Sequence, residues 1–137
     1  MGFKDSVRTC LHKYADFNGR ASRAEFWWFF LFTVLVQFVL MIPLFIIIGI
    51  AAATADSSAG AGIMTALMVI WYIVVFAVAI ALFIPLLAAG ARRLHDYGQT
   101  AWLLLLYFVP CGNIALIVLW ALDGTPADNP YGPRPAA

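Results

Sequence analysis

Long apolar stretches alternate with short polar ones along this chain. Residues 26–55, 57–91 and 99–122 contain no Asp, Glu, Lys, Arg or His. A helix buried in a soluble domain seldom stays uncharged on every face over such a length. The hydrocarbon core of a bilayer is about 30 Å thick and requires roughly 20 helical residues. The runs at 26–50 and 63–89 exceed that length, so the pattern predicts two transmembrane helices.

The third apolar run, residues 101–122, is interrupted at its centre by Pro110-Cys111-Gly112-Asn113. These four residue types favour a turn or a broken helix. Two topologies stay open at this point. A kinked helix would cross the bilayer and leave the tail on the far side. Alternatively, two arms of roughly nine residues, about 14 Å each, would form a re-entrant hairpin and return the tail to the side where the run began.

The first 21 residues predict an amphipathic helix followed by a turn at Asn18-Gly19. Such a helix suits the headgroup layer of a membrane, and the alternative is that its apolar face packs on the protein's own helices. The Ser22 to Glu25 spacing then predicts a capping box at the start of the first span, which makes Glu25 a capping residue rather than a catalytic acid. The apolar residues of the helix recur at spacings of three and four: Phe3, Val7, Cys10, Leu11, Tyr14 and Phe17.

The expected fold class is therefore an all-α integral membrane protein with a single membrane domain over residues 1–137. Its amino-terminal helix is interfacial, two helices span the membrane, and the third apolar segment is broken at residues 110–113 as a hairpin or a kinked span. The expected parts are the interfacial helix and turn (1–21), a first span (22–50), an external loop (51–62), a second span with a cytoplasmic extension (63–95), a cytoplasmic turn (96–100), the broken segment (101–122) and a Pro/Gly-rich tail (123–137).

Composition supports a membrane location. Hydrophobic residues make up 64% of the 137 residues and charged residues 11%, and the mean hydropathy is +0.93. A chain of this size cannot bury that much apolar surface in one small soluble core. A cleaved signal peptide is disfavoured, because the first run begins late and is longer than the roughly 7–15 residues of a signal-peptide apolar region.

Basic residues indicate the orientation, since cytoplasmic connections retain Lys and Arg. Five basic residues precede the first apolar run at residue 26, the connection at 54–62 has none and one acid, Asp56, and Arg92 and Arg93 follow the second apolar run. The expected order is inside, outside, inside, with a cytoplasmic amino terminus. The net charge of only +1 gives no indication of nucleic-acid binding.

Arg92-Arg93-Leu94-His95-Asp96 is the densest group of ionisable residues in the chain. Both arginines are expected in the last helical turn, where the helix dipole and snorkelling to the surface favour them. The Ser22 to Glu25 segment is expected on the same face. This face is predicted to organise itself by ion pairs and to bind anionic lipid headgroups or a partner protein, through Arg20, Arg23, Glu25, Arg92, Arg93, His95 and Asp96.

Three ordered motifs resemble the DUF805 family of small bacterial inner-membrane proteins. They run from Phe17 to Trp28, from Arg92 to Asp96 with Trp102 after it, and from Gly124 to Pro133, where Pro130 departs from the family pattern. The resemblance implies a compact helical domain in the bacterial cytoplasmic (inner) membrane and implies no established activity. A hairpin in the third segment would bring all three motifs to one face, and the resemblance favours it for that reason.

Catalytic and metal-binding patterns are weak. Cys10 and His12 form a lone Cys-x-His without a second ligand pair, so we expect no metal and no cofactor. His95 and Asp96 are adjacent and point in different directions, which disfavours a nucleophilic triad and leaves a membrane-embedded enzyme as a remote alternative. An oligomeric channel or small transporter subunit, lined by Asn113 and Gln37, is the main alternative to a noncatalytic membrane protein. Self-association or a membrane-protein partner also stays open.

Overall fold

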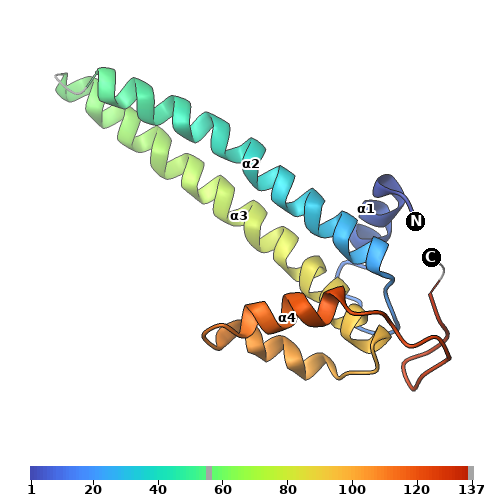
Figure 1. The fold of residues 1–137 in the computed structure, drawn as a ribbon. Coiled ribbons are helices and arrows are strands. Elements are labelled where there is room, and N and C mark those ends of the chain that lie inside the picture. The colour runs from blue at the N-terminus through green and yellow to red at the C-terminus, as the bar shows by residue number, and fades with distance from the viewer. Residues whose placement is uncertain (55–56, 136–137) are drawn as a thin grey trace. The chain divides into compact units, whose positions relative to one another are not determined.

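The computed structural model describes residues 1–54 and 57–135, and in those residues it contains four α-helices and one 3-10 helix (Figure 1). The elements follow the chain as α1 (Phe3–His12), α2 (Arg23–Ala53), α3 (Ser58–Asp96), the 3-10 helix η1 (Ala101–Phe108) and α4 (Gly112–Ala121). The all-α fold class is confirmed, and α2 and α3 are both long and apolar enough to cross a membrane. The expected loop at 51–62 is largely helical, because α2 continues to Ala53 and α3 begins at Ser58. Asp56 lies outside the described residues.

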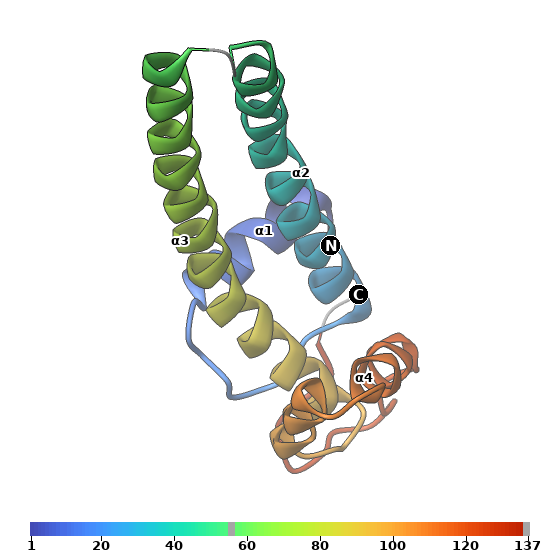
Figure 2. The same cartoon turned by 90° about the vertical axis from the view of Figure 1, so that its left-hand side faces the viewer.

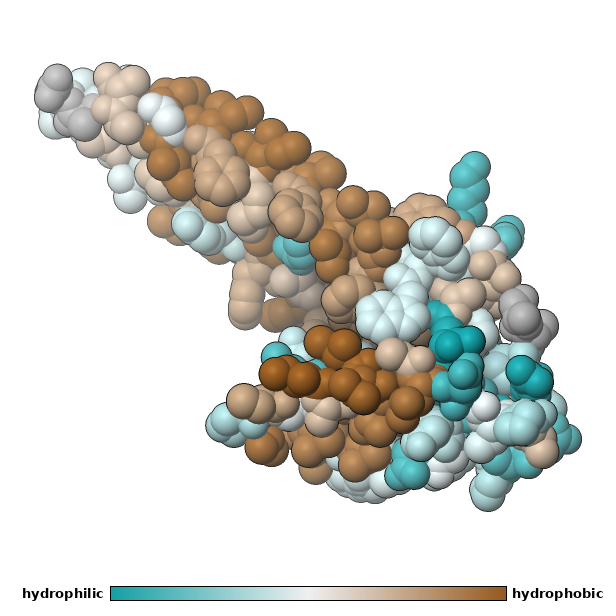
Figure 3. All heavy atoms as spheres, viewed as in Figure 1, coloured by the Kyte–Doolittle hydropathy of each residue, from teal (hydrophilic) through white to brown (hydrophobic). Residues whose placement is uncertain are grey.

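The structure divides into two compact units, one of residues 33–82 and one that combines residues 1–32 with the chain from 83 onward. The first unit consists of the adjoining parts of α2 and α3, which run side by side in Figures 1 and 2. The indole Nε1 of Trp71 donates a hydrogen bond to the Leu40 carbonyl at 2.9 Å and ties the two helices together. The outward residues of this unit are largely exposed and apolar, as expected of side chains that face lipid (Figure 3).

The second unit has a small aromatic core at the start of α2, the end of α3 and α4. The rings of Phe26 and Trp120 lie 4.7 Å apart between centroids. Gly90 lets Trp120 approach α3 closely, since a Cβ at that position would lie 2.9 Å from the indole ring. The indole Nε1 also donates to the Gly90 carbonyl at 3.1 Å. The buried members of this core are Cys10, Phe26, Phe29, Ala89, Leu94, Leu116 and Trp120.

The third apolar run forms a hairpin. Helices η1 and α4 pack against each other, and Figure 2 shows them doubling back through the turn between them. Thr100 caps η1 by accepting from the Trp102 amide at 3.4 Å. The turn itself places Cys111 in the left-handed region at φ 62°. Gly112 is required there, because a side chain would collide with the Leu106 carbonyl. Of the two topologies, the structure adopts the hairpin.

Helix α1 packs on the start of α2 through part of its apolar face. The ring of Phe3 meets those of Trp28 and Phe32 at centroid distances of 5.9 and 6.4 Å, and Cys10 is fully buried. In this part of the helix the apolar face therefore packs on the protein's own helices, as one of the two alternatives expected. Other apolar side chains, Leu11 among them, stay exposed, and their placement in the headgroup layer stays a prediction.

Candidate functional site

Two arginines near the end of α3 lie inside the protein. Arg92 and Arg93 both have 0% exposed surface. The expectation that they snorkel to the surface is wrong, because carboxylates from the protein itself reach them. Nη1 of Arg92 donates to Oε1 of Glu25 at 2.7 Å, and the Cys10 sulfur lies 3.8 Å from the same oxygen. This contact joins α1, α2 and α3 at one point.

Only one of the two hydrogen bonds of the expected capping box is present. The Ser22 hydroxyl accepts from the Glu25 amide at 3.2 Å, as predicted for an N-cap. The Glu25 carboxylate turns inward to Arg92 and does not close the box by reaching back along the chain. Glu25 is therefore a partner in the ion pairs expected of this face, and the local capping pattern alone did not specify that Arg92 would be its partner.

Asp96, the last residue of α3, is shared by two arginines. Arg20 donates from Nε to Oδ1 at 2.9 Å, and its Nη2 forms an ion pair with the same oxygen at 2.8 Å. Arg93 donates to the other oxygen, Oδ2. We call the five buried residues of these pairs the arginine core: Arg20, Glu25, Arg92, Arg93 and Asp96.

Arg20 ties the carboxy-terminal tail to α3. Besides its bond to Asp96, it donates to the carbonyl oxygens of Thr125 at 2.8 Å, Ala127 at 2.9 Å and Gly132 at 3.2 Å. A guanidinium has five N–H donors, and four hydrogen bonds from Arg20 are formed here in addition to its ion pair. The tail therefore lies on the same side of the molecule as the start of α2 and the end of α3.

His95 also holds the tail, through its ring and its backbone carbonyl. Its ring stacks on Tyr131 with centroids 3.9 Å apart and planes 2° from parallel. Its Nδ1 lies 3.1 Å from the Gly19 carbonyl, an acceptor, so Nδ1 carries the hydrogen. Asn129 donates to the His95 carbonyl at 2.8 Å. His95 is thus engaged by Gly19 and Tyr131, and it forms no catalytic pair with its neighbour Asp96.

Burial of so many charges requires nearly complete pairing, because an isolated ion in a low-dielectric interior is very unfavourable. Arg93 meets this requirement by also donating to the carbonyl oxygens of Trp120, at 3.0 Å, and Leu122. In the described part of the chain, every buried side-chain nitrogen and oxygen has a hydrogen-bond partner. The arginine core therefore forms a paired structural unit, in which each buried nitrogen and oxygen already has a partner within the protein.

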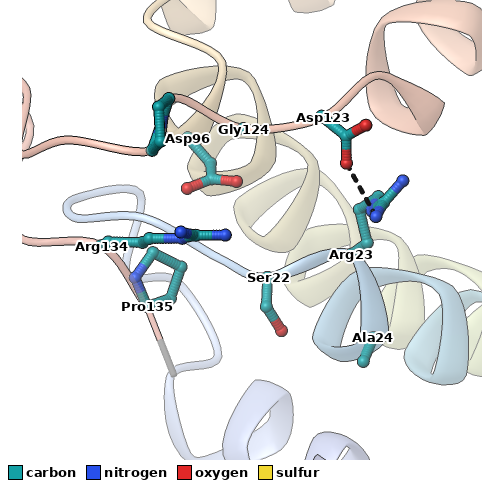
Figure 4. Close-up of a pocket in the computed structure, with 9 residues that line it drawn as sticks. Ser22, Arg23, Ala24, Asp96, Asp123, Gly124, Arg134 and Pro135 are labelled. Carbon is teal, nitrogen blue, oxygen red and sulfur yellow. Dashed lines mark ion pairs between the residues drawn. The ribbon is translucent and has the colours of Figure 1, made fainter. Parts of the chain in front are cut away.

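A polar pocket of about 820 Å³ lies beside the arginine core, between the start of α2, the end of α3 and the tail (Figure 4). Arg23 and Asp123 pair across one edge at 2.7 Å, and their side chains are 54% and 80% exposed. Arg134 extends into the pocket from the tail (Figure 4). The lining residues are Ser22, Arg23, Ala24, Asp96, Asp123, Gly124, Pro126, Arg134 and Pro135.

The electrostatic balance of this region is positive. The arginine core and the ion pair at the pocket edge, taken with Arg134 and Asp128, comprise five arginines and four carboxylates. The first turn of α2 also points toward the pocket, and the N-terminal end of a helix favours negative charge. Arg23 and Arg134 are the cations that a solute entering the pocket would meet.

The predicted site residues fall into two groups. The structure brings six of the seven together in or beside the arginine core, with His95 at its edge, while Arg23 faces the pocket. The two residues proposed to line a pore do not meet in one unit. Gln37 belongs to the unit of residues 33–82, whereas Asn113 lies at the tip of the hairpin and accepts from the Ile114 amide at 2.9 Å.

Sequence reasoning missed the tail residues that complete this region. Thr125 donates from its amide to the Asp96 carbonyl at 2.9 Å, and Gly124 is required because any Cβ would collide with the Asp96 carboxylate. The one available signal was the Gly124-Thr125-Pro126 motif in the tail. Its spacing could not reveal which distant residues it would contact.

The Cys10 thiol contacts the arginine core, and its surroundings suppress its reactivity. Burial and the nearby Glu25 carboxylate raise its pKa to about 12. Because the thiolate is the nucleophile and the metal ligand, a thiol with such a pKa is inert near neutral pH. Among the described residues there is no group of three or more His, Cys, Asp or Glu that could hold a metal ion.

Comparison with known proteins finds a matching family and named relatives. Residues 14–133 match the family described as "Protein of unknown function (DUF805)", and this range includes the whole arginine core. The chain is 36% identical to Inner membrane protein YhaH of Escherichia coli strain K12 over 126 residues, which cover 91% of each chain. It is 31% identical to Inner membrane protein YhaI of the same strain, over 91% of this chain and 90% of the relative. No solved structure matches the chain.

Proposed function

This chain belongs to the DUF805 family of inner-membrane proteins, and we propose that it is a noncatalytic membrane protein whose polar pocket binds the phosphate of an anionic phospholipid. One observation carries the proposal. The buried arginines are fully paired, whereas Arg23 and Arg134 present cationic groups to an open pocket at the start of a membrane-spanning helix. A phosphate held there would accept charge-assisted hydrogen bonds from both arginines.

The position of the pocket along the helices supports a lipid rather than a soluble anion. Arg23 is the first residue of α2, and Trp27 and Trp28 follow one turn later. Tryptophan is enriched at the level of the headgroups, so this spacing supports a pocket at the depth of lipid phosphates. Asp123 is the carboxylate that competes with a phosphate for Arg23. Exposed ion pairs contribute only about 0–1 kcal/mol to stability, so an incoming phosphate would displace Asp123 at little cost in free energy.

The proposed orientation places this face in the cytoplasm. Basic residues are concentrated in the segment before α2, at the end of α3 and at Arg134, and the stretch between α2 and α3 has none. Cytoplasmic connections retain positive charge, which supports a cytoplasmic amino terminus. The bonds from Arg20 to the tail support a cytoplasmic carboxy terminus as well.

The test compares lipid retention by full-length variants purified in mild detergent from membranes that contain phosphatidylglycerol and phosphatidylcholine. Native mass spectrometry measures the bound molecules of each lipid. We expect the Arg23→Gln/Arg134→Gln variant to bind phosphatidylglycerol at least about tenfold more weakly, because it loses two charge-assisted contacts. Lys13→Gln is the matched control, since Lys13 is exposed and outside the pocket.

Equal phosphatidylglycerol retention by the wild type and the double variant would remove the proposal. Crosslinking in native membranes addresses the alternative that a protein occupies the pocket. A single reproducible adduct to a reagent placed at Pro126, which also lines the pocket, lost in the double variant while lipid retention is unchanged, would replace the lipid with a protein partner.

A further inference from the structure

We propose that the hairpin formed by η1 and α4 is a wedge embedded in one leaflet of the membrane, the leaflet beside the polar pocket, and that the acyl chains of that leaflet are its partner. As a consequence, the hairpin adds cross-sectional area to this leaflet alone. The inference is independent of headgroup binding, because it rests on residues that do not line the pocket.

The hairpin has the length of half a bilayer. The 10 residues of α4 extend about 15 Å at 1.5 Å per residue, and the 8 residues of η1 extend about 16 Å at 2.0 Å per residue. The hydrocarbon core is about 30 Å thick. Neither arm can therefore cross the membrane, but each can reach its middle.

The base and the depth of the hairpin are fixed against α3. At the base, Arg93 donates to the Trp120 carbonyl at 3.0 Å, so this end is tied to the arginine core. Near the tip, the ring of Tyr107 meets that of Phe83 at a centroid distance of 5.7 Å. Phe83 lies 13 residues before Asp96, or about 20 Å along the helix. The hairpin thus runs from the polar end of α3 back along its apolar part.

The surface of the hairpin fits acyl chains. Residues 101–122 contain no charged side chain, and the large side chains that point outward are apolar. Phe108, at the tip, is 80% exposed, and Trp102, at the base, is 76% exposed. Figure 3 shows the visible side of the hairpin as a continuous hydrophobic surface. The outward residues are Trp102, Leu105, Tyr107, Phe108, Val109, Ile114, Ile117 and Val118.

The backbone at the tip is also suited to hydrocarbon. Backbone N–H groups without a partner are strongly unfavourable in lipid. Pro110 has no N–H, and the amides of Val109 and Gly112 donate to Leu106 and Val109 at 3.1 and 2.8 Å. The Ile114 amide donates to the Cys111 carbonyl at 3.1 Å and to the Asn113 side chain at 2.9 Å. These bonds leave fewer amide groups at the tip that need water as a partner.

The natural cysteines allow a direct test of depth. Cys111 is exposed at the tip, whereas Cys10 is buried and inert, so a fluorophore attached in detergent labels the tip selectively. After reconstitution of the full-length protein, quenching is compared between lipids that carry a doxyl group near the glycerol backbone and lipids that carry it near the end of the acyl chain. The control is a Cys111→Ser/Gln99→Cys variant, which moves the label to the base of the hairpin.

We expect the label at Cys111 to be quenched most strongly by the deep doxyl group and the label at Gln99→Cys by the shallow one. Stronger shallow quenching at Cys111 would show that the hairpin lies on the surface and would overturn the proposal. Two further outcomes would also overturn it. One is reaction of Cys111 with an impermeant reagent from the far side, and the other is label-to-label contact that persists on dilution with lipid, which would mean that a second copy covers the hairpin.

A second measurement tests whether the hairpin acts as a wedge, by comparing how much protein is found in strongly and weakly curved membranes. A Cys111→Ser/Ala127→Cys variant carries an exposed thiol in the tail, and an impermeant dye added outside reconstituted vesicles marks only molecules with the tail outward. We expect the labelled protein to be at least about twofold denser per unit lipid area on small vesicles than on large ones, because the outer leaflet of a small vesicle has larger packing gaps. Equal density on both would overturn the wedge.

Discussion

Arg92 and Glu25 are 67 positions apart in the chain, and their charged groups meet at 2.7 Å inside the protein. Neither side chain is more than 5% exposed. This pair joins the start of one membrane-spanning helix to the end of the other, and it explains how a chain with so few charged residues places several of them in its interior. It also gives the first prediction.

Glu25→Leu is expected to destabilise the protein by about 3–5 kcal/mol, because it leaves the Arg92 guanidinium buried without its counter-charge. The Glu25→Leu/Arg92→Leu variant should recover most of that loss, since two apolar side chains of similar volume replace the pair. Unfolding in detergent with increasing denaturant measures both. Loss of the exposed pair in Asp123→Asn serves as the comparison and should cost no more than about 1 kcal/mol. A double variant as unstable as Glu25→Leu would contradict this account.

Gly124→Ala is expected to displace the tail, because the added Cβ would collide with the Asp96 carboxylate. Overpacking of this kind costs about 1–3 kcal/mol. Limited proteolysis should then cleave the tail faster than in the wild type. Gly49→Ala is the matched control, since nothing lies within 4 Å of a Cβ at that position. Unchanged tail cleavage in Gly124→Ala would mean that the tail does not depend on this close approach.

The Trp120 indole should anchor the base of the hairpin. Trp120→Phe removes the hydrogen bond to the Gly90 carbonyl, so a loss of about 1 kcal/mol is expected. Trp102→Phe changes the same side chain where it is largely exposed and should have little effect on stability. Thermal unfolding of the two variants in the same detergent distinguishes the positions. Equal shifts in Tm would argue against a specific role for the Trp120 bond.

Cys10 should make stability fall at high pH. Its pKa is raised by burial from 9.0 to about 12, so folding favours the protonated thiol. The stabilisation is fully present below pH 9 and is lost as the pH rises toward about 12. Denaturant unfolding of wild type and Cys10→Ala across this range should show a steeper decline for the wild type. Parallel declines would show that Cys10 ionises normally in the folded protein.

Thiol labelling checks the same environment independently. In a Cys111→Ser background, Cys10 should react with an alkylating reagent only after unfolding, because the thiolate is the reactive form and the side chain is buried. Rapid labelling of the folded protein near neutral pH would contradict the structure around Cys10.

Local patterns in the sequence were sufficient for the two long helices and for the start of α2. Charge-free length predicted α2 and α3, and the Ser22 hydroxyl caps α2 as expected. Pro110 and Gly112 predicted the break in the third run, because these residues restrict or free the backbone wherever they occur. The choice between hairpin and crossing depended on how the two arms pack, which local pattern does not contain.

The burial of the charged residues could not be predicted from local sequence patterns. Arg92 and Arg93 were expected at the surface, because a basic pair at the end of an apolar helix usually reaches the headgroups. Whether a charge can instead be buried depends on its partners, and Glu25 and Asp96 reach the pair only once α2, α3 and the tail have packed.

The sequence by itself determined the membrane class, the two long helices, the broken third segment and the clustering of charge near their ends. These follow from hydrophobicity and backbone preference, which act over a few neighbouring residues. Tertiary structure alone decided that the arginines are buried, that Arg20 holds the tail and that Arg23 and Arg134 face the pocket. Ion pairing and burial act between residues tens of positions apart, so only the folded arrangement of the chain specifies them.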